Sequence, residues 1–160
     1  MGHRNPQGLA FHPETGDLWE SEHDPRGGDE INIIKKGSNY GWPIISYGVE
    51  YRGGGVNGTG LTQKNGMEQP VYYYDPATAP SGMTFYSGKL INEWKNNLFV
   101  AMLKGMHISR LVIDDKTGKI QFEERLLTAE NQRFRHITEG PDGALYILTD
   151  AEKGRLYRIK

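Results

Sequence analysis

Apolar residues in this chain gather in short runs that recur as pairs, with a polar turn between the two runs of each pair. The pairs lie at residues 18–22 and 29–34, at 97–101 and 109–113, and at 144–148 and 154–159. Short runs bounded by turn residues are typical of strands rather than helices. A strand pair that recurs at long spacing is typical of a radial β array, above all a β-propeller. The pattern therefore predicts repeated antiparallel sheets.

Further short runs complete the picture of an all-β chain. Strands are predicted at residues 7–11, 71–74, 83–86 and 120–127, with turns at 13–17, 114–118 and 141–143. Residues 89–95 have room for one helical turn, and residues 75–82 and 131–136 are expected to form loops. These strands make about three four-stranded units, too few to close a ring of the usual size.

Residues 47–67 differ from the rest because they hold many glycines and few apolar side chains. A long stretch of this kind is expected to be a surface insertion rather than a linker between domains. No other shift in composition marks a domain boundary. The sequence therefore predicts a single partial β-propeller domain over residues 1–160.

Composition narrows the possible partners and compartments. The 160 residues carry a formal net charge of −1, which argues against a surface dedicated to nucleic acid or to membranes. The chain contains no cysteine, so disulfides and thiol catalysis are excluded. No stretch approaches the roughly 18 apolar residues of a membrane span. The polar start has no signal peptide, and we expect the chain to be part of a longer protein.

The loop from His23 to Glu30 is a candidate calcium site. Pro25 and the adjacent Gly27 and Gly28 allow a sharp bend that can turn successive carbonyls outward. Carbonyls together with Asp29 and Glu30 would form the all-oxygen environment that Ca²⁺ prefers. The spacing is not that of an EF-hand, so a solvated turn remains the alternative from these residues alone.

Basic side chains recur in the loops of separate units, and they suggest an anionic ligand. They are Arg4, Lys104, Arg133 and Arg135. Loops of equivalent position in a propeller converge at one end of the central channel, where these cations could bind carboxylates. The alternative is that they are ordinary surface residues. The five histidines have no zinc-site spacing, and no hydrolase elbow or phosphate loop is present.

Several longer strings in the chain resemble the soluble PQQ-dependent aldose dehydrogenases, the glucose/sorbosone dehydrogenase family. The strings follow the family's order over essentially the whole chain: GHRNPQG at residues 2–8, EHDPRGGDEIN at 22–32, KGSNYGWP at 36–43, EQPV at 68–71, SGM at 81–83, LK at 103–104, RFR at 133–135 and GPDG at 140–143. The resemblance implies the C-terminal half of a six-bladed propeller that binds pyrroloquinoline quinone (PQQ) and Ca²⁺ at the mouth of its channel.

The resemblance also implies roles for particular residues. Arg4 and Asn5 would contact the cofactor, while its carboxylates and quinone oxygens would be held by Lys104, Arg133 and Arg135. The backbone carbonyls of Asp24 and Pro25 would ligate the calcium beside the cofactor. A second, structural calcium would bind at Glu30 and Tyr40.

Two departures from the family pattern bear on these roles. Asp24 stands where the family commonly has glycine, which adds a carboxylate beside the expected calcium. The family's catalytic base is a histidine upstream of the GHRN string, and none of the five histidines here occupies that position. The resemblance therefore implies a cofactor cradle without a catalytic residue in this chain.

The resemblance implies oxidation of an aldose to its lactone, in the periplasm or outside the cell. Half a ring would expose sheet edges and apolar faces, so we expect a homo-oligomer or pairing with a missing N-terminal half. Two alternatives remain open from the sequence. One is a calcium-dependent propeller hydrolase of the lactonase type, and the other is a non-catalytic sugar- or protein-binding module.

Overall fold

The computed structural model describes residues 1–52, 55–114 and 116–160, and these residues form three antiparallel sheets. The first sheet has the order β1-β2-β3-β4, with strands Pro6–Phe11, Leu18–Glu22, Asp29–Ile34 and Tyr72–Tyr74. The second has the order β5-β6-β7-β8, with strands Pro80–Phe85, Leu98–Met102, Ile108–Ile113 and Ile120–Leu126. The third contains β9 (Phe134–Glu139), β10 (Leu145–Thr149) and β11 (Leu156–Ile159).

The all-β prediction is confirmed, with two sheets of four strands and a third of three strands among the described residues. Short 3₁₀ turns occur at Asn92–Trp94, within the predicted helical turn, and at Thr128–Glu130. No helix in residues 1–52, 55–114 and 116–160 is long and apolar enough to cross a membrane.

Two of the predicted loops are wrong. Residues 75–82 contain the start of β5, and residues 131–136 contain the start of β9. In β9, Phe134 and Ile137 are buried while the two residues between them are exposed. A register shift against β10, between Leu148 and Thr149, breaks the strict alternation that would have revealed this strand.

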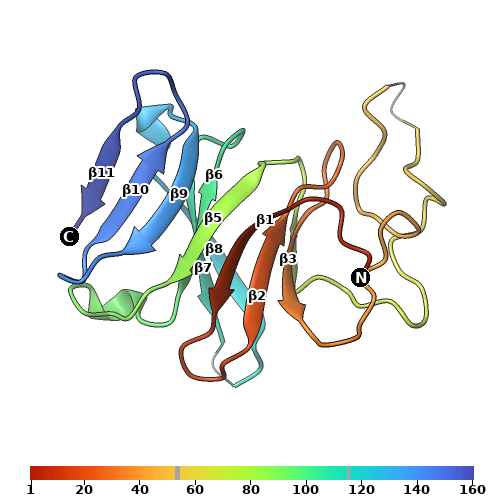
Figure 1. Ribbon diagram of the computed structural model, residues 1–160, viewed down its shortest axis with the longest axis horizontal. Helices are drawn as coiled ribbons and strands as arrows, with labels where there is room; N and C mark the ends of the chain where they lie inside the picture. Colours follow the sequence, from red (N-terminus) through yellow and green to blue (C-terminus); the bar gives the residue numbers. More distant parts are fainter. Residues whose placement is uncertain (53–54, 115) are drawn as a thin grey trace.

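The sheets stand side by side because their first strands are neighbours: β1 lies beside β5, and β5 lies beside β9 (Figure 1). The second sheet is therefore covered on both faces, and every residue of β6 is buried. Leu98, Val100 and Met102 pack into the core shared with the first sheet. Phe99 and Ala101 face the other way, into the core shared with the third sheet. Because successive side chains of β6 point to opposite faces, this one strand contributes to the cores on both sides and so connects all three sheets.

A long connection links β3 to β4, and it contains the predicted Gly-rich insertion at 47–67. Residues 53 and 54 of that insertion lie outside the described residues, as does residue 115 of the predicted turn at 114–118. Isolated bridges hold the described part: Val49 pairs with Arg26 and Val56, and Ile45 pairs with Leu61. The insertion is therefore attached to the loop between β2 and β3.

Truncating the core between the second and third sheets is expected to destabilise the fold. Phe99 is fully buried, and its ring contacts those of Tyr86 and Trp94 at centroid distances of 6.0 and 5.3 Å. Phe99→Ala should lower the free energy of unfolding by about 3–5 kcal/mol. The matched control is Phe122→Ala, at a side chain that is 56% exposed. Urea denaturation that showed equal losses for the two variants would contradict this packing.

Candidate functional site

The loops that carry the predicted site residues meet at one end of the three sheets, where β1, β5 and β9 begin. His23, in the β2–β3 loop, places Nε2 2.7 Å from the carbonyl oxygen of Pro80 at the start of β5. Arg135, in β9, donates through Nη1 to Ser81 Oγ at 2.7 Å and to Gln7 Oε1 at 2.9 Å. These contacts connect all three sheets at their shared end.

Arg4 and Asn5 join the same network of hydrogen bonds. Gln7 Nε2 donates to Asn5 Oδ1 at 2.9 Å, which links Asn5 through Gln7 to Arg135. Arg4 Nη1 donates to the carbonyl oxygen of His23 at 3.0 Å, and its guanidinium lies 5.3 Å from the centre of the Trp42 ring. The structure therefore brings Arg4, Asn5 and Arg135 together.

Lys104 and Arg133 lie at the same end of the sheets but outside that network. The Lys104 backbone N–H donates to the carbonyl oxygen of Thr78 at 3.0 Å, and the residue is exposed. Among the described residues its ammonium has no ion-pair partner. Arg133 just precedes β9, and its Nη2 is 2.8 Å from Asp150 Oδ2. Arg133 is thus held toward the third sheet by a carboxylate.

Asp29 anchors this end of the molecule, a role that the sequence did not reveal. It is buried, and its two carboxylate oxygens accept three backbone N–H groups: Asp24 N at 3.0 Å, Thr78 N at 2.7 Å and Ala79 N at 2.7 Å. These bonds show Asp29 holding the loop in place, and its expected part in the oxygen environment for calcium stays a prediction. Two of its partners, Thr78 and Ala79, lie 49 and 50 residues away in the segment that precedes β5. No local motif could indicate contacts at this distance along the chain.

The carbonyls of Asp24 and Pro25 fit the predicted calcium ligands. Both residues are buried, and no hydrogen bond to either carbonyl oxygen occurs in the described part of the chain. Both carbonyl oxygens are therefore available as ligands within the described part of the chain. The bend that aims them depends on Gly28, where a Cβ would lie 2.4 Å from the Gly48 nitrogen.

The Asp24 side chain contacts the Gly-rich insertion through one of its carboxylate oxygens. Its Oδ2 accepts a short hydrogen bond from Ser46 Oγ, which also accepts from Gly48 N at 2.9 Å and from Asn57 Nδ2 at 3.2 Å. Burial raises the pKa of the Asp24 carboxyl to about 6, against the opposing effect of the Ser46 hydrogen bond. Asp24 thus ties the β2–β3 loop to the Gly-rich insertion.

Buried polar side chains cover one face of the first sheet, opposite the face that carries Trp19 and Ile31. Strand register pairs Glu20 with Asn32 and Glu22 with Glu30, which places all four on this face. The single Asn32 Nδ2 group lies 3.4, 3.1 and 3.1 Å from the carboxylates of Glu20, Glu22 and Glu30. Glu22 has further partners in His3 Nδ1 and in the backbone N–H groups of Arg4 and Asn5, whereas Glu20 Oε1 is buried without a partner.

Glu30 and Tyr40, the predicted ligands of a structural calcium, border a cavity beside this face. The cavity is about 10 Å³, which is about the space for one water or ion. Arg4, Glu22 and Asp24 also line it, so a guanidinium and three carboxyl groups border the same space. The Tyr40 hydroxyl donates to the Ile33 carbonyl at 2.8 Å and accepts from Lys35 N at 2.7 Å. Only the Tyr40 carbonyl is left as a ligand, and the described residues donate no hydrogen bond to it.

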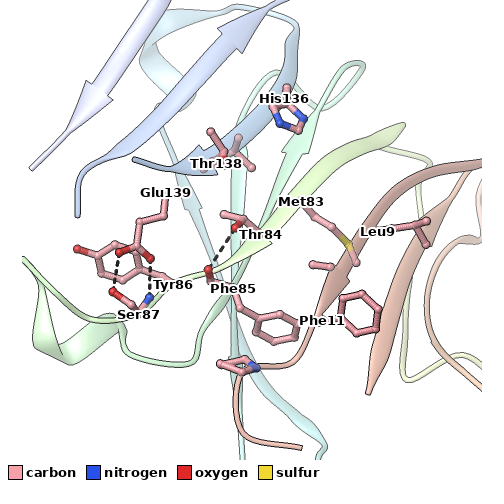
Figure 2. Close-up of a pocket in the computed structure, with 13 residues that line it drawn as sticks. Leu9, Phe11, Met83, Thr84, Phe85, Tyr86, Ser87, His136, Thr138 and Glu139 are labelled. Carbon is pink, nitrogen blue, oxygen red and sulfur yellow. Dashed lines mark hydrogen bonds between the residues drawn. The ribbon is translucent and has the colours of Figure 1, made fainter. Parts of the chain in front are cut away.

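A larger cavity of about 480 Å³ lies toward the opposite ends of the inner strands β1, β5 and β9 (Figure 2). Leu9 and Phe11 reach into it from β1, where they are 61% and 69% exposed. Met83 and Phe85 line it from β5, with His136 from β9. Its lining lacks the cluster of cations, so the charged groups and the apolar cavity occupy different parts of the inner surface.

Stability of the cation-free protein is expected to fall as pH rises. Burial, and then the neighbouring Glu22, raise the pKa of Glu20 from 4.5 to about 9, and burial raises that of Glu30 to about 8. Both carboxyls bind protons more tightly in the folded protein than in the unfolded chain. Between pH 4.5 and about 8 to 9, unfolding therefore releases protons, and the free energy of unfolding declines as pH rises. Glu20→Gln should reduce that decline by roughly 1–3 kcal/mol.

Urea denaturation with a chelator, from acid to alkaline pH, measures this decline. Glu152→Gln, at an exposed position, is the control and should behave as the unaltered chain. A decline that Glu20→Gln leaves unchanged would show that Glu20 is ionised in the folded protein.

Comparison with known proteins adds to this geometry. A family model described as Glucose / Sorbosone dehydrogenase matches residues 1–158. The chain is 42% identical over 158 residues to aldose sugar dehydrogenase YliI of Escherichia coli, covering 99% of this chain and 42% of that protein. It is 32% identical over 201 residues to quinoprotein glucose dehydrogenase B of Acinetobacter calcoaceticus, covering 94% of this chain and 42% of the relative.

Solved structures agree with these sequence relatives. The apo form of the soluble E. coli aldose sugar dehydrogenase superposes with a TM-score of 0.90 at 42% identity, covering 98% of this chain and 45% of that one. The PQQ-bound aldose sugar dehydrogenase of Streptomyces coelicolor gives 0.72 at 28% identity, covering 98% and 43%. These neighbours are propellers, so the predicted fold class is confirmed.

The chain spans less than half the length of these relatives. Within that span, the matches run through all three sheets and through the loops that carry the basic residues and the unpaired carbonyls. The chain belongs to the glucose/sorbosone dehydrogenase family.

Proposed function

We propose that this chain supplies the cofactor cradle of a PQQ- and calcium-dependent aldose dehydrogenase. The observation that carries the proposal is the meeting of Arg4, Asn5 and Arg135 at the loop end of the sheets, in the same region as the unpaired carbonyls of Asp24 and Pro25. PQQ is a tricarboxylated quinone, so its binding requires several cations and a metal ion to balance its charge.

Each residue would have a distinct part in holding the cofactor. Arg4 and Arg135 would bind carboxylates or quinone oxygens, because guanidinium groups donate in a planar fork. Lys104 would bring a positive charge to the cofactor from the second sheet. Arg133 would do the same after giving up its ion pair with Asp150 for one with the cofactor. Asn5 would offer its amide. When bound, PQQ supplies the two-electron acceptor for oxidation of an aldose to its lactone.

Calcium would have two places in this proposal. The carbonyls of Asp24 and Pro25 would ligate the ion beside the cofactor, where it also acts as a Lewis acid. Glu30 and the Tyr40 carbonyl would ligate a structural ion in the small cavity of about 10 Å³. The oxygen-only donors at both places fit a hard cation of this type.

We assign no catalytic base to this chain. His23 and His107 each place a ring nitrogen near a backbone carbonyl, at 2.7 and 2.8 Å, and His12 Nδ1 accepts from two backbone N–H groups at 3.3 Å. His3 lies against Glu22. The base would come from another part of the complete ring, as the family resemblance implies.

The lactonase alternative requires acidic and amide ligands around the channel. The described structure instead places Glu20, Glu22 and Glu30 with Asn32 on the sheet face opposite Trp19, while the inner strands begin among basic groups. The geometry therefore favours an anionic ligand. We further propose a periplasmic or secreted location and assembly with a second copy or an N-terminal half, supported by the exposed Leu9 and Phe11 of β1.

Removing one guanidinium of the cradle is expected to weaken PQQ binding. Arg135→Ala should raise the dissociation constant by roughly tenfold or more, as expected when a hydrogen bond to a charged group is lost. The control is Arg125→Ala in β8, whose side chain is 54% exposed and pairs with Glu123. Equilibrium dialysis with PQQ and Ca²⁺ measures the difference. No binding by the unaltered chain, or equal binding by both variants, would overturn the proposed cradle.

Calcium is expected to stabilise the protein through Glu30. Adding Ca²⁺ to chelator-treated protein should raise the melting temperature, because the ion binds the folded form alone. Glu30→Gln should lose most of that rise, whereas the exposed control Glu152→Gln should keep it. Differential scanning calorimetry with and without Ca²⁺ makes the comparison. An undiminished rise in Glu30→Gln would place the stabilising ion elsewhere.

A further inference from the structure

A second group of potential ligands lies on the polar face of the first sheet. His3 Nδ1 is 2.9 Å from Glu22 Oε1 and 3.7 Å from Glu20 Oε2. One ligand atom from each of the three residues falls within 4.8 Å of the other two. Ligand atoms about 2.1 Å from a tetrahedral zinc ion lie about 3.4 Å apart. The observed spacings fall on either side of that value, so small side-chain movements would suffice to bind an ion.

One buried carboxylate oxygen without a partner indicates that something is missing from this cluster. Glu20 Oε1 has no hydrogen-bond partner, although the Glu20 side chain is only 3% exposed. Asn32 Oδ1 is also buried and unpartnered, and the same amide places its nitrogen 3.4 and 3.1 Å from the carboxylates of Glu20 and Glu22. An unpaired carboxylate oxygen and an unpaired amide oxygen are both good cation ligands.

The local structure positions the histidine ring. Trp42 N donates to the Gly2 carbonyl at 2.8 Å and Tyr40 N donates to that of Met1 at 2.9 Å, which fastens the first residues to the 39–42 segment. The His3 ring stacks on the Tyr40 ring with centroids 4.3 Å apart. The His3 side chain is 21% exposed, so an ion has access from solvent. The Arg4 backbone N–H donates to Glu22 Oε2 at 2.6 Å. Hydrogen bonds of this kind orient the ligands of metal ions.

We propose that His3, Glu20 and Glu22 form a site for a divalent first-row transition ion such as Zn²⁺, with Asn32 as its neighbour. The imidazole nitrogen distinguishes it from the oxygen-only calcium places at Asp24, Pro25, Glu30 and Tyr40. The ion would replace the proton between His3 and Glu22 and give the unpaired Glu20 oxygen a positively charged partner. It would fasten the segment before β1 to β2, and so position Arg4 and Asn5 at the cradle.

Titration with Co²⁺ tests this site, because its visible absorption reports the ligands directly. Chelator-treated protein should bind Co²⁺ with an intense visible spectrum, and Zn²⁺ should displace it. His3→Ala should weaken Co²⁺ binding by at least roughly 100-fold, since loss of even an outer partner of a metal ligand costs 10–100-fold. His136→Ala, at an exposed histidine in β9, is the matched control and should bind as the unaltered chain.

Two further variants separate this site from the calcium places. Glu20→Gln, which preserves size, should also weaken Co²⁺ binding while keeping the far-ultraviolet circular dichroism spectrum. Glu30→Gln should lose the calcium response and retain Co²⁺ binding. Absence of Co²⁺ binding, or binding that Glu30→Gln abolishes and His3→Ala does not, would overturn the proposed site. Because these readouts involve neither PQQ nor turnover, their failure would leave the cofactor proposal separately testable.

Discussion

The loop end of this molecule depends on one buried carboxylate. Asp29 accepts the backbone N–H groups of Asp24, Thr78 and Ala79, and so ties the β2–β3 loop to the segment that enters β5. A carboxylate that receives three N–H groups is well stabilised even when it is buried. Together with the contact between His23 Nε2 and the Pro80 carbonyl, this tie positions the carbonyls of Asp24 and Pro25 relative to the second sheet.

Positive and negative side chains occupy two separate regions at the loop end of the sheets. Basic groups gather where the inner strands begin, and carboxylates gather on the far face of the first sheet. The segment from His3 to Asn5 touches both, because His3 and the Arg4 backbone contact Glu22 while the Arg4 guanidinium contacts the His23 carbonyl. In the proposed account, a cation bound by the carboxylates would therefore also help to position Arg4. Structural ions and cofactor binding would be coupled through this short segment.

Sequence reasoning succeeded where local pattern determines structure. The strands around Trp19, Val100 and Ile147 follow from apolar runs and turns. The ligand roles of the basic residues in separate loops stay predictions. Sequence reasoning failed where partners are remote: Asp29 binds residues 49 and 50 positions away, and Arg133 pairs with Asp150. The start of β9 was missed because a register shift breaks its alternation. Glu20 and Asn32 were also missed, since their shared face emerges only from strand register.

A crystal structure of the chain grown with PQQ and Ca²⁺ would test the central claim most directly. The account predicts the quinone at the loop end, with carboxylates or quinone oxygens on Arg4 and Arg135 and a calcium ion on the carbonyls of Asp24 and Pro25. PQQ bound instead in the apolar cavity beside Leu9 and Phe11 would contradict it. So would carbonyls that remain unligated while PQQ is bound.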